Sequence, residues 1–176
     1  EEKLGITYHL VDQYMDSGDI LAQYSFDYNG QPVSKINNQI GLLVEENTGD
    51  VVYKYITGKI KPTKQNTIEA TYGCKRNLKD CEVDFNMENK YLERFFKALT
   101  EPYPLPRLVV KNNIYEIIEY NIVKREYFSA IGRVLNIDNK GAWIKTKEGF
   151  LIVNNIRSIE DGKIVKLSDL VKIGYR

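Results

Sequence analysis

From Pro106 to the end of the chain, short β-rich runs alternate with turn signals, and this alternation constrains the fold more than any other feature. Asn-Asn, Asp-Asn-Lys-Gly, Lys-Glu-Gly and Asp-Gly sequences separate the runs, as they do in hairpins. Regular spacing of short strands predicts a small antiparallel barrel. The five or six predicted strands span Arg107–Lys111, Ile114–Val123, Phe128–Ile137, Ala142–Thr146, Phe150–Ile156 and Ile164–Val165.

The beginning of the chain predicts a strand, a tight polar loop and a second strand. Residues 6–11 and 19–28 are rich in apolar, β-branched and aromatic side chains, and the loop between them carries Gly18. We therefore expect the two strands to pair. Such strands cannot build a parallel α/β sheet alone, and the chain begins with Glu1 rather than Met, so we expect most of that sheet to lie upstream.

Two helical segments are expected after the second strand. Pro32 and Ser34 suit a helix start, and apolar residues recur at helical spacing over 36–44. Asn47-Thr48-Gly49 is expected to interrupt this pattern, and a further turn or two is expected over 51–56.

A later helix is predicted between linker segments and the barrel region. Residues 58–66 and 71–84 have linker composition, and Asn86 is expected to cap the helix that follows. Pro102 and Pro104 should end it. One apolar face, expected to pack in the core, comprises Tyr91, Leu92, Phe95, Phe96 and Leu99.

Charge and cysteine content exclude several classes of protein. The chain has 25 basic and 24 acidic residues, so no strong overall field would draw it to nucleic acid or membrane. Cys74 and Cys81 match no zinc or redox spacing, and we expect two reduced cysteines. The apolar runs are far shorter than a bilayer requires, and no leader opens the chain, so a cytoplasmic protein is expected.

Residues 101–176 are mildly basic, with 13 Lys and Arg against nine Asp and Glu. Such a bias suits phosphate contacts on RNA, but it also suits a solvated barrel surface, which we favour. For Trp143, on a predicted strand with apolar neighbours, core packing is favoured over base stacking.

The most specific feature is the loop that carries Asp16, followed by Ser17, Gly18 and Asp19. A carboxylate held at a strand end can accept protons, orient an imidazole or cap a turn, and spacing alone favours the cap. The only histidine, His9, lies seven residues before it. His9 suits either a half-buried strand position or a role in steadying the loop.

The segment resembles the G-x-T-x-H … D-x-G-D-I-(L/I)-x-Q stretch of the folate-dependent formyltransferases. The matching residues are Gly5, Thr7, His9, Asp16, Gly18, Asp19, Ile20, Leu21 and Gln23. Residues 132–135, 141–146, 149–153 and 167–170 are similar to the C-terminal domain of the methionyl-tRNA formyltransferase group. Residues 98–104 are at least as similar to the enzymes that formylate nucleotide-linked amino sugars.

The resemblance implies an α/β fold in two parts. These are the C-terminal part of a Rossmann-like catalytic domain and a small antiparallel, OB-like β-barrel. The expected domains are 1–70 for the catalytic part, 71–105 for a linker and helix, and 106–176 for the barrel.

The resemblance also implies the activity: a formyl group passes from 10-formyltetrahydrofolate, the cosubstrate, to a primary amine, without a metal. The acceptor would be methionyl initiator tRNA or a nucleotide-linked amino sugar. Asp16 would be catalytic, ordering a His and a water that relay protons. His9 and Gly18 would support it. The folate loop would comprise Val11, Asp12, Gln13, Tyr14 and Met15, with Val11 and Met15 as walls and Asp12 and Tyr14 contributing mainly peptide groups.

One departure is plain, because the family's N-x-H motif is missing from these 176 residues. The resemblance implies that the catalytic Asn and His lie upstream of Glu1. Two alternatives remain: a non-catalytic nucleic-acid-binding barrel module, and a hydrolase that transfers the formyl group to water. We further expect the side chain of Asp19 to close the turn.

Overall fold

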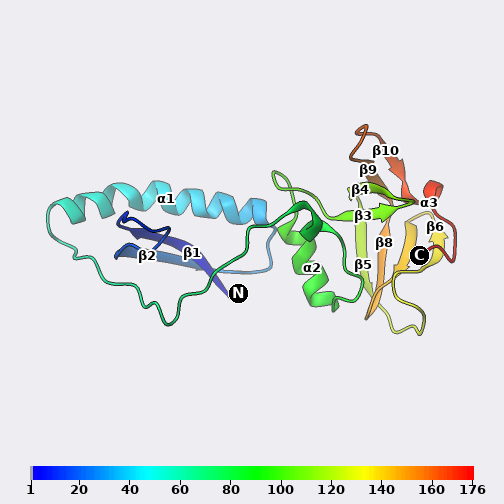
Figure 1. Ribbon diagram of the computed structural model, residues 1–176, viewed down its shortest axis with the longest axis horizontal. Helices are drawn as coiled ribbons and strands as arrows, with labels where there is room; N and C mark the ends of the chain where they lie inside the picture. Colours follow the sequence, from blue (N-terminus) through cyan, green and yellow to red (C-terminus); the bar gives the residue numbers. More distant parts are fainter. Residues whose placement is uncertain (1) are drawn as a thin grey trace. The chain divides into compact units, whose positions relative to one another are not determined.

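The computed structural model describes residues 2–176 and divides into two compact units, Glu1–Lys75 and Arg76–Arg176. Each unit is described by itself below, and Figure 1 shows the elements of both. The chain is of mixed α/β type, and its strand pairs are antiparallel.

The first unit is a β-hairpin with one long helix (Figure 1). Strand β1 (Lys3–His9) pairs with β2 (Ile20–Asp27) from Lys3↔Asp27 to His9↔Ile20, with an irregularity after Tyr8. The predicted pairing is thus confirmed, although β1 ends at His9 and leaves residues 10–19 to the loop. Helix α1 (Val33–Ile56) contacts both strands.

Helix α1 runs without interruption through Asn47, Thr48 and Gly49, where a break was expected. The Nδ2 of Asn47 donates to Leu43 O at 2.8 Å, and the Oγ1 of Thr48 donates to Val44 O at 2.6 Å. Both polar side chains therefore bond to the preceding helical turn instead of competing with it. The prediction of two helical pieces was wrong for this reason.

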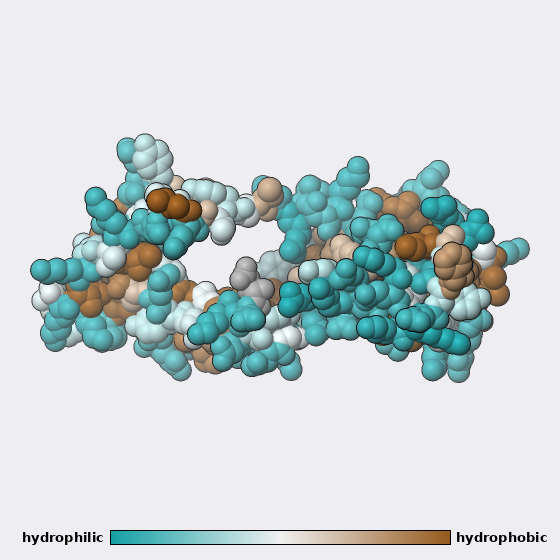
Figure 2. Space-filling model, turned by 90° about the horizontal axis from the view of Figure 1, so that it is seen from below, coloured by the Kyte–Doolittle hydropathy of each residue, from teal (hydrophilic) through white to brown (hydrophobic). Residues whose placement is uncertain are grey.

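The chain after α1 returns alongside the beginning of β2. Ile20 N donates to Thr63 O at 2.7 Å, and Thr63 N donates to Ile20 O at 2.9 Å. This isolated bridge brings residues 63–65 next to the loop between β1 and β2. Apolar side chains remain exposed in this unit, including Leu42, Val52 and Ile56 of α1. Figure 2 shows further apolar residues at its surface, at the left of the view from below.

The second unit begins with a short 3-10 helix, η1 (Leu78–Cys81), capped by Asn77, and continues with α2 (Asn89–Ala98). Asn86 does not cap α2 as expected. Its N–H and Nδ2 donate to Asp84 Oδ1, and the helix follows Glu88. Asn86 thus belongs to a turn stabilised by the Asp84 side chain, rather than to the N-terminal cap of α2.

Two four-stranded antiparallel sheets follow. The first has the order β10-β9-β4-β3, and the second has the order β5-β8-β7-β6. A four-residue helix, α3 (Leu167–Leu170), comes directly after β10 and was not predicted. The strands span Arg107–Val110 (β3), Asn113–Ile117 (β4), Tyr120–Lys124 (β5), Val134–Asp138 (β6), Gly141–Lys145 (β7), Gly149–Val153 (β8), Asn155–Ser158 (β9) and Ile164–Lys166 (β10).

Three predicted strands differ from those observed. The runs 114–123 and 150–156 are each divided, because the chain passes from one sheet to the other at residues 118–119 and at Asn154. The run 128–137 becomes a strand only at Val134. Hydrophobic pattern does not reveal a change of sheet, because side chains on both sides of the change face the same core.

The core of the second unit lies between the two sheets and α2. It includes Leu108, Ile117 and Ile156 from one sheet and Val134, Leu151 and Val153 from the other. Helix α2 contributes Leu92 and Phe96, and Leu99 is buried just after it; Phe95 is partly buried against this core. Tyr91 departs from the predicted core face, because half of its surface is exposed.

Cys74 is exposed and Cys81 is buried, and both are free thiols, which confirms the prediction of reduced cysteines. Within residues 2–176, no helix combines the length and apolar character that crossing a membrane would require. Over the same residues, no cluster of three or more His, Cys, Asp and Glu side chains has the arrangement of a metal site.

Candidate functional site

A main-chain hydrogen bond closes the base of the loop over residues 10–19, and the side chain of Asp12 forms hydrogen bonds inside it. Leu10 N donates to Asp19 O at 2.9 Å. The Oδ1 of Asp12 accepts from Ser17 Oγ at 2.7 Å and from Tyr14 N at 2.9 Å. The Ser17 hydroxyl, followed by the Tyr14 amide, lowers the pKa of the Asp12 carboxyl below its usual value. Asp12 therefore has the closing role that the sequence assigned to Asp19, while Asp19 contributes its carbonyl.

Asp16 occupies the outer turn of this loop with its carboxylate in solvent. Its φ of +56° lies in the left-handed region, which Asp tolerates better than most residues, and 85% of its side chain is exposed. Its Oδ1 lies 3.7 Å from His9 Nε2. The structure therefore brings together the two side chains that the sequence selected.

The orientation of His9 follows from its other ring nitrogen. His9 Nδ1 lies 2.8 Å from Leu10 O, and a carbonyl only accepts, so Nδ1 carries the proton of this bond. In the neutral ring, Nε2 is then an unprotonated acceptor facing Asp16. Only the imidazolium, with a second proton on Nε2, can donate to the Asp16 carboxylate.

Gly18 is required by the close approach of two main-chain segments. A Cβ built at this position would lie 1.7 Å from Leu10 O and 3.4 Å from His9 Nδ1. No side chain fits at that distance, so only glycine lets the chain return beside the hydrogen bond that orients His9. Gly18 thus supports the His9 geometry.

Gln65 joins the loop from 47 residues away and was not selected as a site residue. Its Nε2 donates to Gly18 O at 2.7 Å and to Asp16 O at 2.9 Å. The amide therefore holds the main chain on both sides of Ser17. No local spacing in the sequence could reveal a partner so distant along the chain.

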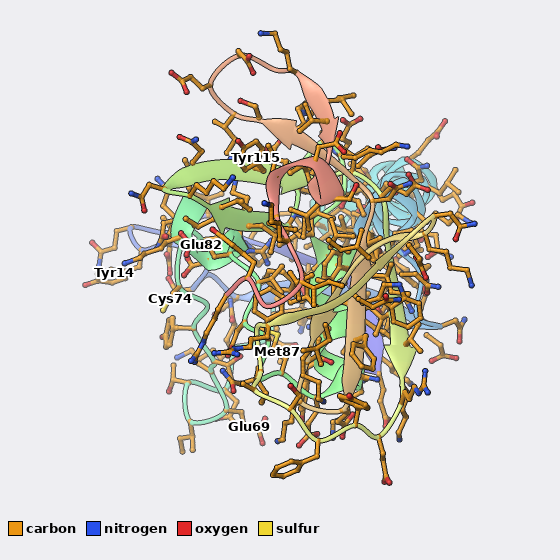
Figure 3. All side chains as sticks on the ribbon, turned by 90° about the vertical axis from the view of Figure 1, so that its right-hand side faces the viewer. Tyr14, Glu69, Cys74, Glu82, Met87 and Tyr115 are labelled. Atoms are coloured by element: carbon orange, nitrogen blue, oxygen red, sulfur yellow. The ribbon has the colours of Figure 1, made fainter. Side chains whose placement is uncertain are left out.

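The remaining loop residues present apolar side chains and unpaired main-chain groups. Val11 and Met15 are 93% and 90% exposed, and Tyr14 projects from the loop into solvent, as its label in Figure 3 shows. Among the residues that the structure describes, the main-chain groups of Val11, Gln13 and Met15 have no hydrogen-bond partner. The loop thus offers free amides and carbonyls between two apolar side chains.

The fold and this loop define a two-unit α/β protein, with an exposed acid beside a half-buried histidine in one unit and a two-sheet core in the other. Residues 76–174 match the family model described as "Formyl transferase, C-terminal domain". This match covers more than half of the chain, and the chain belongs to the formyl transferase family.

Curated relatives carry the name methionyl-tRNA formyltransferase. The protein from Clostridium tetani is 27% identical over 163 residues, which are 89% of this chain and 51% of that protein. The protein from Streptococcus pneumoniae is 24% identical over 175 residues, which are 99% of this chain and 55% of that protein. The chain spans about half the length of the curated relatives it matches.

Solved structures share the fold at lower identity. HypX from Aquifex aeolicus in complex with tetrahydrofolic acid has a TM-score of 0.66 at 19% identity, covering 96% of this chain and 30% of HypX. The sugar 3N-formyl transferase WlaRD, solved in the presence of dTDP and 5-N-formyl-THF, has a TM-score of 0.60 at 17% identity, covering 92% and 57%. Methionyl-tRNA formyltransferase from Clostridium thermocellum has a TM-score of 0.57 at 18% identity, covering 90% and 57%.

Proposed function

We propose that this chain is part of an enzyme that transfers a formyl group from 10-formyltetrahydrofolate to a primary amine. Membership of the formyl transferase family supports the reaction class. The observation that carries the proposal to this chain is the pair of His9 and Asp16, 3.7 Å apart on a loop held by Gln65. The acceptor is methionyl initiator tRNA or a nucleotide-linked amino sugar, both of which occur among the named relatives and neighbours.

The loop suits the cosubstrate in its chemistry. A pterin has a flat ring with a donor and acceptor edge, which unpaired peptide groups can recognise while apolar side chains cover its faces. Gln13 and its neighbours provide those peptide groups, and Val11 and Met15 provide the apolar flanks. Asp12 holds the loop closed, and Tyr14 contributes its exposed ring. The cosubstrate itself supplies the formyl carbon, and no metal enters the proposal.

Asp16 has the role of holding and moving a proton. The attacking amine must lose a proton as it bonds to the formyl carbon, and a positioned carboxylate can accept it or orient the group that does. His9 Nε2 faces Asp16 Oδ1 and, once protonated, holds the carboxylate in place. Gly18 keeps Leu10 O where it fixes the His9 ring.

The family's other catalytic groups are assigned outside these 176 residues. His9 is the only histidine of the sequence and is occupied with Leu10 and Asp16, so a further catalytic His and Asn would come from the half of the relatives that this chain does not span. On this proposal, Asp16 is one member of a site shared with residues elsewhere.

We assign the two units to the two parts of the family fold. The hairpin and α1 form the C-terminal part of a Rossmann-like catalytic domain, residues 1–70, followed by a linker and helix over 71–105. Residues 106–176 form the OB-like domain, an assignment supported by two antiparallel sheets that share one core.

Replacement of Asp16 in the longest natural form of the protein tests the activity. Formyl transfer from 10-formyltetrahydrofolate is measured with methionyl-tRNA and with a nucleotide-linked amino sugar. Asp16→Asn should lower kcat on the order of 10² to 10⁴-fold, because the amide cannot accept a proton. Asp27→Asn, an exposed acid at the end of β2, is the matched control and should leave kcat unchanged.

Two outcomes contradict the proposal. Full activity of Asp16→Asn would remove the carboxylate from the reaction and favour the non-catalytic nucleic-acid module. Formate release at the full rate without any amine would identify a hydrolase instead.

A further inference from the structure

Lys145, the last residue of β7, is almost completely buried, with only 3% of its surface exposed. Lysine is seldom buried to this degree unless its charge is paired. Its Nζ donates to Thr146 O at 2.5 Å and lies 3.5 Å from Gly149 O. The ammonium has three donors, and these two carbonyls leave at least one of them without a close acceptor.

Among the carboxylates that the structure describes, none pairs with this charge. Within residues 2–176, Lys145 takes part in none of the ion pairs. Phe150, whose ring centroid is 5.8 Å from Nζ, gives only a weak cation–π contact at that distance. The nearest acid along the chain, Glu148, accepts instead from Asn89 N at 2.9 Å, at the first residue of α2. A buried ammonium without a counter-charge is unfavourable, and an anion beside it would remove the penalty.

The space for such an anion exists, because Lys145 lines an open hollow of about 530 Å³. Lys124 and Lys147 line it as well, from the end of β5 and from the turn between β7 and β8. The loop that connects β5 to β6 runs past this turn (Figure 1), and Arg125 N donates to Glu148 O at 3.2 Å.

The same loop carries two aromatic rings at the hollow, Tyr127 and Phe128. The ring of Tyr127 lies 6.0 Å from that of Phe150, so it is anchored to the sheet. Phe128 is fully exposed, which is unfavourable for a large apolar side chain that has nothing to contact. A flat ring placed against Phe128 would bury it by stacking.

We propose that this hollow binds a nucleotide, with the phosphate at Lys145 and the base against Phe128. Lys145 gives the phosphate a charge-assisted hydrogen bond from the floor, and Lys124 adds charge at the rim. The Nζ of Lys147 forms an ion pair with Glu88 Oε1 at 3.3 Å, so Lys147 contributes less to phosphate binding. The phosphate and base belong to a free nucleotide or to a nucleotide unit of RNA. This site lies within the second unit and does not depend on the function proposed for Asp16.

Two acids, Glu126 and Glu148, also line the hollow and oppose an anion. Glu148 accepts a hydrogen bond from Asn89 N, whereas Glu126 is exposed and forms no ion pair among the described residues. Glu126→Gln should therefore tighten phosphate binding several-fold. This change of opposite sign separates an electrostatic site from a loss caused by altered packing.

Binding of inorganic phosphate to the full 176-residue chain is the first test, at ionic strength matched with chloride. Trp143, the single tryptophan, packs 5.6 Å from Phe150 and reports through its fluorescence. We expect saturable binding that Lys145→Met weakens at least tenfold. Lys140→Met, which removes an exposed charge in the β6–β7 turn, is the matched control and should bind as the unmodified chain does.

Adenosine monophosphate and a short single-stranded oligoadenylate form the second test. Both should bind more tightly than phosphate, and Phe128→Ala should remove that gain while phosphate affinity remains. Tighter binding of the oligoadenylate than of the monophosphate identifies RNA as the source. Equal affinity per site identifies a free nucleotide.

The proposal is overturned if phosphate does not bind at millimolar concentration, or if Lys145→Met binds it unchanged. If Lys145→Met fails to fold, the unmodified chain and Glu126→Gln are used to test the proposal instead. Phosphate must then raise the unfolding temperature more than chloride at equal ionic strength, and must raise it further in Glu126→Gln. Failure of either effect also overturns the site.

Discussion

At the scale of single residues, two glycines of the first unit differ in whether the structure requires glycine at that position. Gly18 lies where a Cβ would meet Leu10 O at 1.7 Å, so its absence of a side chain is a condition for the loop. Gly41 lies inside α1, and a Cβ added there would meet nothing within 4 Å, so at this position glycine only adds backbone freedom.

Alanine substitution at these positions should therefore change stability with opposite signs. Gly18→Ala cannot fit without moving Leu10, which displaces the hydrogen bond to His9 and should abolish the ordered loop. Gly41→Ala should stabilise the helical state of α1 by about 0.5–1 kcal/mol. The helical circular dichroism signal of the full chain measures this change, and hydrogen exchange of Leu10 N, which donates to Asp19 O, measures the loss of the loop in Gly18→Ala. Unchanged exchange of this amide in Gly18→Ala would contradict the close approach.

Asp161, in the turn between β9 and β10, should give the second unit an acid-dependent stability. Hydrogen bonds from Lys163, followed by one with Ser158, lower the pKa of the Asp161 carboxyl from 3.8 to about 2. The folded-state pKa is below the unfolded one, so the contribution is complete above pH 4 and is lost as pH falls from 3.8 towards 2. Solvent screening keeps it small, because the pair is exposed.

Thermal unfolding between pH 5 and pH 2 tests this expectation. Asp161→Asn should flatten the fall in unfolding temperature within that window and should be less stable than the unmodified chain at pH 5. Glu160→Gln removes the neighbouring exposed charge and is the control. The same pH slope in Asp161→Asn and the unmodified chain would show that the turn contributes nothing.

At the scale of elements, the sequence predicted the hairpin and most strand boundaries, because alternation and turn residues determine both locally. The alternation over residues 6–11 and 19–28 predicted the hairpin, and the turn sequences after Pro106 located the breaks between most strands. The continuous α1 was missed because Asn47 and Thr48 satisfy their side chains on their own helix, which residue propensity does not contain.

In the candidate site, too, some residues could be selected from local sequence and others could not. Asp16, His9 and Gly18 were found because they lie within one short segment, where spacing and resemblance act together. Gln65 was missed because its contact spans 47 residues, and the closing bond expected from the side chain of Asp19 is made by Asp12 instead. A partner distant along the chain decided the first case, and the local conformation of the loop decided the second.

The packing of helix α2 against the sheet that contains β5 can be tested directly. Phe96 is buried, and its ring centroid lies 4.0 Å from that of Tyr120 on β5. Phe96→Ala should lower the free energy of unfolding by about 3–5 kcal/mol, because it leaves a cavity between helix and sheet. Arg94→Ala, exposed on the same helix, should change it by less than about 0.5 kcal/mol. Urea titration separates the two, and similar values would place α2 outside the core.

At the scale of the whole molecule, buried apolar residues are divided very unevenly between the two units. Among the described residues 2–75, Val51 is the one buried apolar side chain, and a hairpin with a single helix surrounds it. The second unit holds all the other buried apolar residues, from Cys81 to Val171. Because burial of apolar surface is the main favourable term in folding, stability should be concentrated in residues 76–176.

Separate expression of the two units tests this distribution. The fragment 76–176 should unfold cooperatively in urea with nearly the midpoint of the same transition in the full chain, because its sheets, α2 and α3 share one core. The fragment 2–75 should show no cooperative transition, because a two-stranded hairpin with one helix buries too little apolar surface. Circular dichroism of both fragments and of the full chain gives the three curves. A cooperative transition in 2–75 would mean that the first unit is stabilised by contacts beyond its small core. Absence of a transition in 76–176 would mean that the shared core of the second unit does not suffice on its own.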